Sequence, residues 1–275
     1  MSNVNIVAEF DADNLKLLKQ NVGIVYNAEI DTGTKKDVKK VINEQQQKLI
    51  AVVAAAGATE ERTSSEKALL YSMGFSELIY VQPTVALAAY FDYKFVESTP
   101  IMSVVIGEEA TDIAIILADK VLYSGILDIG VNSCVQAIND FIMQKYNVES
   151  GYSKAKDIFM DIASLLPNDS RFAKYPEFII KAEQVRTLIY PLYEKIIGAI
   201  NHLLSEASVE VIRQINSTGV LFGGVGAQIR GLSEAVYSVI GLQSMIADDP
   251  QNALIFGAGN LLSTPKVLLK MTHNA

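Results

Sequence analysis

Glycines that follow predicted strands are the residues of this 275-residue sequence best placed to do chemistry. Residues 223–226 read Gly-Gly-Val-Gly directly after an apolar run, and Gly107 follows another such run. A glycine turn at the end of a strand lets backbone N–H groups approach a phosphate, because no Cβ atom stands in the way. A tight turn between a strand and a helix explains the 223–226 pattern equally well, so both interpretations stay open.

Metal and nucleophile chemistry is restricted by the small number of cysteines and histidines. Cys134 is the only cysteine, so neither a disulfide framework nor a thiolate zinc site can form within one chain. His202 and His273 are the only histidines, which argues against a histidine metal site and a Ser-His-Asp triad. Cys134 falls on a predicted amphipathic helix, and we expect it to pack in the core. We assign no catalytic residue and no metal ligand.

The composition predicts a folded, acidic protein with a large core. Half of the residues are apolar and 20% are charged, and the formal net charge is −8. An acidic surface repels nucleic acid and anionic lipid, so neither is favoured as a partner. The sequence contains no signal peptide pattern and no uncharged apolar stretch of about 18 residues. We therefore expect a cytoplasmic protein, associated with a membrane only through partners.

The hydrophobic pattern alternates strands with helices. Strands are expected at residues 5–10, 23–26, 49–55, 77–81, 102–106, 112–117, 120–125, 219–222 and 243–246. Helices are expected at residues 34–47, 59–73, 84–93, 132–146, 154–165, 182–206, 209–214, 227–239 and from 252 onward, with a polar loop at 167–176. This is an α/β protein. Three strands and a helix follow Pro100, and a weaker version precedes it, which suggests a duplicated unit.

Residues 220–232 read VLFGGVGAQIRGL, and residues 247–250 read Ala-Asp-Asp-Pro. The first segment resembles the adenosine-side motif of the MreB family of bacterial actins, and the second resembles that family's acidic-proline segment. The order and spacing of segments from Leu49 to the C-terminus fit the same family. Residues 130–167 are similar to its helix pair. The resemblance implies an actin-like fold of two ribonuclease-H-like domains around a nucleotide cleft, with the outer subdomains reduced or missing. It places the first half at 1–99 plus 252–275 and the second at 100–251.

The second phosphate loop departs from the family pattern. Where the family has Asp-Ile-Gly-Gly-Gly-Thr, residues 105–110 read Val-Ile-Gly-Glu-Glu-Ala. Val105 replaces the metal-side acid, and Glu108 and Glu109 replace two glycines. At about 4 Å, each carboxylate would repel a phosphate by roughly 1 to 4 kcal/mol per charge pair.

The rest of the nucleotide machinery is partly retained. The first phosphate loop, at residues 9–14, has no glycine, although Asp11 matches a metal-side acid. The family's water-polarising glutamate aligns with Arg62, while Asp161 keeps an acid on the nucleotide-facing helix. The resemblance therefore leaves a residual cofactor-binding set, which is Asp11, Gly107, Asp161, Gly223, Gly224 and Gly226.

The expected function follows from these departures. The resemblance implies a filament-forming protein that organises cell-wall synthesis, and the lost phosphate loops predict a degenerate, non-hydrolysing scaffold that needs no cofactor. Its partners would be other proteins, either full-length MreB-like filaments or further copies of itself, and not nucleic acid. Two alternatives remain. One is a compact actin-fold ATPase or chaperone-like factor that binds ATP and Mg²⁺ and resembles the ethanolamine-utilisation actin-like proteins. The other is an adaptor similar to FtsA or PilM.

Overall fold

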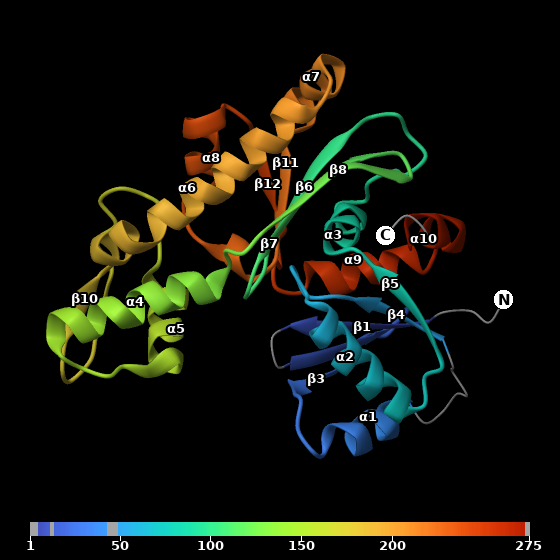
Figure 1. Cartoon of the computed structure of the whole chain (residues 1–275), viewed down its shortest axis with the longest axis horizontal. Helices are drawn as coiled ribbons and strands as arrows, with labels where there is room; N and C mark the ends of the chain where they lie inside the picture. The colour runs from blue at the N-terminus through green and yellow to red at the C-terminus, as the bar shows by residue number, and fades with distance from the viewer. Residues whose placement is uncertain (1–4, 12–13, 43–48, 273–275) are drawn as a thin grey trace.

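The computed structural model describes residues 5–11, 14–42 and 49–272, which form two five-stranded sheets covered by helices (Figure 1). The first sheet has the order β3-β2-β1-β4-β5, with β1 Ile6–Asp11, β2 Asn14–Lys19, β3 Gly23–Glu29, β4 Leu49–Val53 and β5 Glu77–Val81. The second has the order β8-β7-β6-β11-β12, with β6 Ile101–Ile106, β7 Thr111–Leu117, β8 Lys120–Leu127, β11 Val220–Gly223 and β12 Ser244–Ile246.

Both sheets have the same topology. In each, three antiparallel strands follow one another along the chain, and two later strands add in parallel beside the first. This repetition confirms the predicted α/β class and the duplicated unit. We call each sheet, with the helices packed on it, a half. The half boundaries near residues 99 and 251 stay predictions.

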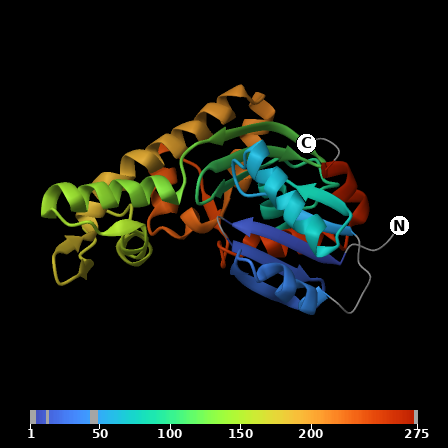
Figure 2. The same cartoon turned by 60° about the horizontal axis from the view of Figure 1, so that its bottom comes forward.

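Ten α-helices cover the sheets in the described part of the chain. They are α1 Thr34–Ile42, α2 Glu60–Met73, α3 Pro83–Tyr90, α4 Val131–Tyr146, α5 Gly151–Ile162, α6 Ala182–Glu206, α7 Val209–Thr218, α8 Leu232–Ile240, α9 Ala253–Leu261 and α10 Pro265–Thr272. Figures 1 and 2 show α4 and α6 extending away from the first sheet, together with a small hairpin of β9 Phe172–Lys174 and β10 Ile179–Lys181.

Helices α3 and α9 form a shared layer between the two sheets (Figure 1). Their side chains join one apolar cluster with Val7 and Ala51 of the first sheet and Val105 and Leu221 of the second. The two helices cross closely at Gly257, where a Cβ atom would lie 1.9 Å from the Ala86 carbonyl oxygen. The halves are therefore joined by apolar packing.

Local sequence signals explain most element boundaries. The Thr59 hydroxyl accepts a hydrogen bond from Arg62 N and caps α2, which ends at Gly74 with φ of 110°. Every residue of β6 is buried, as a continuous apolar run predicts for a central strand.

Four parts of the structure differ from the sequence-based expectation. The final helix expected from 252 onward is divided into α9 and α10. Strand β2 was not predicted, because its lysines interrupt the apolar pattern. The expected loop at 167–176 contains strand β9 of the small hairpin. The expected helix at 227–239 begins only at Leu232, because Gly231 adopts φ of 84° and a short 3₁₀ turn, Val225–Gln228, precedes it. The expected end of the 34–47 helix, beyond Ile42, lies outside the described residues.

Candidate functional site

A cleft opens where the two halves meet, and the space in and around it measures about 430 Å³, part of which is open solvent. Residues of both halves line it, together with the segment that leads into α9. The lining residues are Glu9, Phe10, Ala54, Ala55, Ala56, Arg62, Val105, Gly107, Glu108, Glu109, Gly224, Val225, Gln251 and Leu254. Three carboxylates and one guanidinium, from β1, α2 and the β6–β7 hairpin, thus converge on a small space whose other lining is mostly apolar.

The hairpin between β6 and β7 forms one wall of the cleft and bonds to itself and to α4. Gly107 N donates to the Ala110 carbonyl at 2.9 Å. At the start of α4, Val131 N donates to Gly107 O at 3.0 Å and Asn132 N to Glu108 O at 2.8 Å. Free N–H groups at a helix N-terminus make an anion site. These N–H groups already have partners within the chain.

Glu108 is buried and bound by side chains of α5. Lys156 Nζ lies 2.7 Å from Glu108 Oε1, and the Tyr152 hydroxyl lies 3.5 Å from Glu108 Oε2. The same hydroxyl makes a short contact with the Asn132 amide oxygen. Burial of Tyr152 and the neighbouring Glu108 charge raise the pKa of the Tyr152 phenol. Glu108 is thus a structural part of the second half.

Glu109 reaches across the cleft to the first half. Its Oε2 atom lies 2.8 Å from Arg62 Nη1, while Arg62 Nε donates to Glu66 Oε1 at 3.1 Å. Glu66 is buried on α2, and this burial raises its carboxyl pKa although the Arg62 guanidinium opposes the shift. Arg62 therefore connects a buried carboxylate of its own helix with one of the opposite half.

A buried lysine of β2 lies beside the cleft residues Glu9 and Gln251. Lys16 Nζ lies 3.9 Å from Glu9 Oε1 and donates to the Gln251 carbonyl at 2.9 Å. The side chains of Lys16 and Glu9 are 2% and 5% exposed. Sequence reasoning missed this lysine together with strand β2. The one available signal was its place between Leu15 and Leu17, two apolar residues that suggest a buried strand.

The halves touch beside the hairpin. A Cβ atom on Gly57 would lie 2.4 Å from the Ala110 Cβ, and Gly57 N donates to Asp112 Oδ1 at 3.3 Å. Asp112 stands opposite Val105 in the β6–β7 register. Burial raises the pKa of the Asp112 carboxyl to about 6, although the Gly57 N–H opposes this shift.

The sequence matches one protein family along most of its length. The family described as MreB/Mbl protein matches residues 22–270. The chain belongs to the MreB/Mbl family. Among curated relatives, the cell shape-determining protein MreB of Escherichia coli K12 is 25% identical over 200 residues, which are 69% of this chain and 58% of that protein. The cell shape-determining protein Mbl of Bacillus subtilis 168 is 23% identical over 184 residues, 62% of this chain and 54% of that protein.

Solved structures confirm the actin-like fold of this MreB-family chain. The MreB5 structure of Spiroplasma citri bound to AMPPNP superposes with a TM-score of 0.83 at 19% identity, covering 95% of this chain and 96% of that chain. The MamK double helical filament superposes with a TM-score of 0.69 at 16% identity, covering 94% and 98%. The matches to E. coli MreB and to Mbl span less than two thirds of those proteins.

The glycines predicted from the family motif lie against the protein itself. A Cβ atom on Gly224, whose φ is 83°, would lie 2.4 Å from the Ile106 carbonyl oxygen, and one on Gly226 would lie 2.2 Å from Ile106 Cγ2. A Cβ atom on Gly223 would lie 2.5 Å from Leu87 Cδ1. The turn lies so close to Ile106 of β6 and Leu87 of α3 that glycine suits these positions whether or not a ligand binds. The tight-turn interpretation has a structural basis.

The structure brings together only part of the predicted cofactor set. Gly107 and Gly224 line the cleft, and Gly223 and Gly226 flank Gly224 in the same turn. Asp11 ends β1 beside the cleft residue Phe10, but its side chain lies outside the described residues. Asp161 is absent from the cleft lining that the structure describes.

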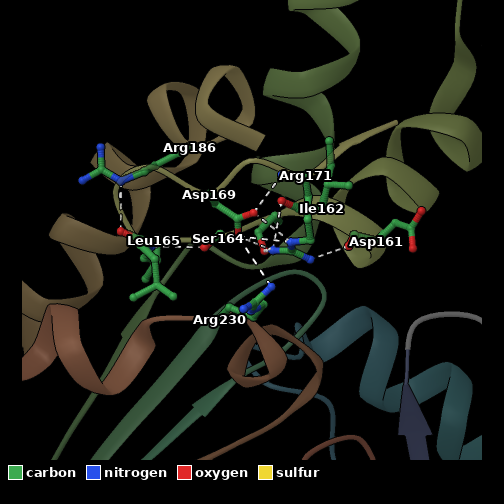
Figure 3. A network of polar contacts seen from close by, with 10 residues as sticks. Asp161, Ile162, Ser164, Leu165, Asp169, Arg171, Arg186 and Arg230 are labelled. Carbon is green, nitrogen blue, oxygen red and sulfur yellow. Dashed lines mark hydrogen bonds and ion pairs between the residues drawn. The ribbon is translucent and has the colours of Figure 1, made fainter. Parts of the chain in front are cut away.

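Asp161 belongs instead to the capped end of α5 (Figure 3). Arg171 donates to the carbonyl oxygens of Asp161 and Ala163, at 2.6 and 3.2 Å, while the Asp161 carboxylate points away from this network. Arg171 also binds Asp169 at 2.8 Å, and Arg230 lies 3.7 Å from the same carboxylate. The Arg171 guanidinium holds the pKa of Asp169 well below its usual range. Asp161 thus contributes a backbone carbonyl to the fold.

The described part of the chain offers neither a metal cluster nor a membrane-spanning helix. Within 5–11, 14–42 and 49–272, no group of three or more His, Cys, Asp or Glu residues could hold a metal ion. No helix in that part of the chain is both long and apolar enough to cross a membrane.

Proposed function

We propose that this MreB-family protein is a cytoskeletal scaffold that acts through protein contacts and neither binds nor hydrolyses ATP. One observation carries the proposal. Glu108 and Glu109 lie on the β6–β7 hairpin, at the positions of the family's second phosphate loop. Glu108 is ion-paired with Lys156, and Glu109 with Arg62. The positions where an anion would bind therefore already contain anions and their counter-charges.

The other cleft residues support the same conclusion. Magnesium is held by oxygen ligands, and a phosphate cradle needs unpaired N–H groups. Val105 is 1% exposed within the apolar cluster that joins the halves, and the Gly107 N–H is bonded to Ala110. We therefore take the cleft to be unsuited to Mg-ATP and derive no catalytic step through it.

The partners follow from the family. The curated relatives are named cell shape-determining proteins, and MamK has been solved as a double helical filament. By analogy, this chain associates with copies of itself or with full-length MreB-family filaments. The α3–α9 layer supplies apolar packing between the two halves. A scaffold of this kind needs no nucleotide to keep its shape.

Sedimentation tests the proposal. The purified chain would be centrifuged over a concentration series, alone, with Mg-ATP, and after treatment with a nucleotide-degrading enzyme. A parallel series would contain a full-length MreB-family protein. The proposal expects the chain to pellet, by itself or with the full-length filaments, at a threshold that nucleotide leaves unchanged. Pelleting that requires ATP would refute it, as would failure to pellet under both conditions.

A further inference from the structure

We infer that the Arg62–Glu109 ion pair is a latch that holds the two halves closed over the cleft, in the place that a bound nucleotide would take. Arg62 lies on α2 of the first half, and Glu109 lies on the β6–β7 hairpin of the second. Their Nη1 and Oε2 atoms are 2.8 Å apart. The inference rests on the proposed function and deepens it, because it names what controls the cleft.

The arginine is held in place for this contact. Its Nε atom is bonded to Glu66 Oε1, one helical turn along α2, and only 18% of its side chain is exposed. A planar guanidinium has five donors in a fixed fork, so one edge can bind a carboxylate of its own helix while another binds a second carboxylate. Because Glu66 fixes the side chain, little further entropy is lost when Glu109 closes onto it.

The halves are also tied at a second edge, by a hydrogen bond and an ion pair. Ala118 N donates to the Tyr93 hydroxyl at 2.9 Å, and Lys270 of α10 pairs with Asp119 of the β7–β8 turn. These contacts lie in the turn of the second sheet that is remote from the hairpin. They can act as a hinge, while Arg62 and Glu109 close the cleft edge.

The latch responds to ionic conditions, because half of the Glu109 side chain is exposed, at 51%. Partly exposed ion pairs are weakened by salt and contribute about 0.2–1 kcal/mol, which changes a closed-to-open ratio by about 1.4- to fivefold. The conformation of the cleft would therefore depend on salt and on partners that contact Glu109, and not on nucleotide.

Distance measurements between spin labels test the latch in the full chain. Ala68 of α2 and Gln144 of α4 are exposed in opposite halves and would be replaced by cysteine, while the native Cys134 thiol is buried. Glu109→Gln would be compared with Glu210→Gln. The control variant removes an Arg213–Glu210 pair of 2.9 Å that lies within the single helix α7.

The latch predicts that Glu109→Gln raises the ratio of longer to shorter distances about 1.4- to fivefold, while Glu210→Gln leaves the distribution unchanged. Salt at 1 M should shift the unsubstituted chain toward the Glu109→Gln distribution and barely affect that variant. Equal distributions for the two variants would overturn the latch. A change of the unsubstituted chain on addition of Mg-ATP would instead overturn the proposed function, so the two failures are distinguishable.

Discussion

Substitution of Val105 by aspartate tests whether the cleft is closed by apolar packing. Val105 lies between Asp112 of β7 and Gly223 of β11 in the sheet register, and its side chain belongs to the cluster that joins the halves. An aspartate would place a carboxylate in this cluster, opposite a second carboxylate whose pKa burial already raises to about 6. Burial in the apolar cluster and the Asp112 carboxylate therefore both oppose ionisation of the new side chain.

The magnitude follows from two contributions. Loss of the buried valine costs about 1.5–3 kcal/mol. The new carboxyl must also stay protonated at pH 7, which is about three units above its unfolded-state pKa of about 3.9. This costs about 4 kcal/mol more. The pKa of the introduced aspartate is higher in the folded than in the unfolded chain. The cost of keeping it protonated is therefore absent below about pH 4 and grows as the pH rises to its folded-state pKa. The total of about 6 kcal/mol at pH 7 is comparable with the whole stability of many domains.

Urea unfolding of Val105→Asp and Val105→Asn at pH 4.5 and 7.5 would measure the effect. Asparagine has almost the same shape and no charge, so the difference between the two variants isolates ionisation. We expect Val105→Asp to be less stable than Val105→Asn by several kcal/mol at pH 7.5 and by much less at pH 4.5. Equal stability at pH 7.5 would refute the reasoning, because the site would then hold water or a cation beside the charge.

Three further predictions concern other parts of the structure. Gly257→Ala should lower the free energy of unfolding by about 1–3 kcal/mol, because the added Cβ would meet Ala86 O at 1.9 Å. Gly198→Ala should not lower it, because Gly198 of α6 has open space around it. Equal effects of the two substitutions in urea unfolding would contradict this. Asp112 has a folded pKa of about 6, so its destabilising effect is absent below about pH 4 and complete above about pH 6. Between these pH values the ionising Asp112 should lower the free energy of unfolding by about 2–3 kcal/mol, and Asp112→Asn should abolish this decrease. A variant whose stability depends on pH as the unsubstituted protein's does would contradict this prediction. Burial raises the pKa of the Cys134 thiol to about 12, so a thiol reagent at pH 8 should label it only as fast as the chain unfolds; rapid labelling of the native protein would contradict this.

The fold could be predicted from sequence where burial leaves a local pattern. Strands β4 and β6 are continuous apolar runs, and their predicted ends agree with the structure to within two residues. Strand β2 could not be found this way, because Lys16 is polar and its burial depends on Gln251, 235 positions away. A tertiary contact of this kind leaves no trace in the local pattern.

The candidate site could be predicted only in part, for the same reason. The carboxylates at Glu108 and Glu109 were visible as a departure from the family, but their partners were not, since Lys156 is 48 positions from Glu108. The glycines at 223–226 fitted both a ligand and a tight turn. Only the contact distances to Ile106 give the turn its structural reason.

The proposal that the protein works without nucleotide is tested most directly by its melting temperature with and without 1 mM Mg-ATP. We expect no shift, because the cleft carboxylates are paired within the chain and Val105 is buried. A nucleotide bound with a Kd of about 10 μM would stabilise the fold by about 2.7 kcal/mol and raise the melting temperature by about 5–10 °C. A shift of that size would contradict the proposal.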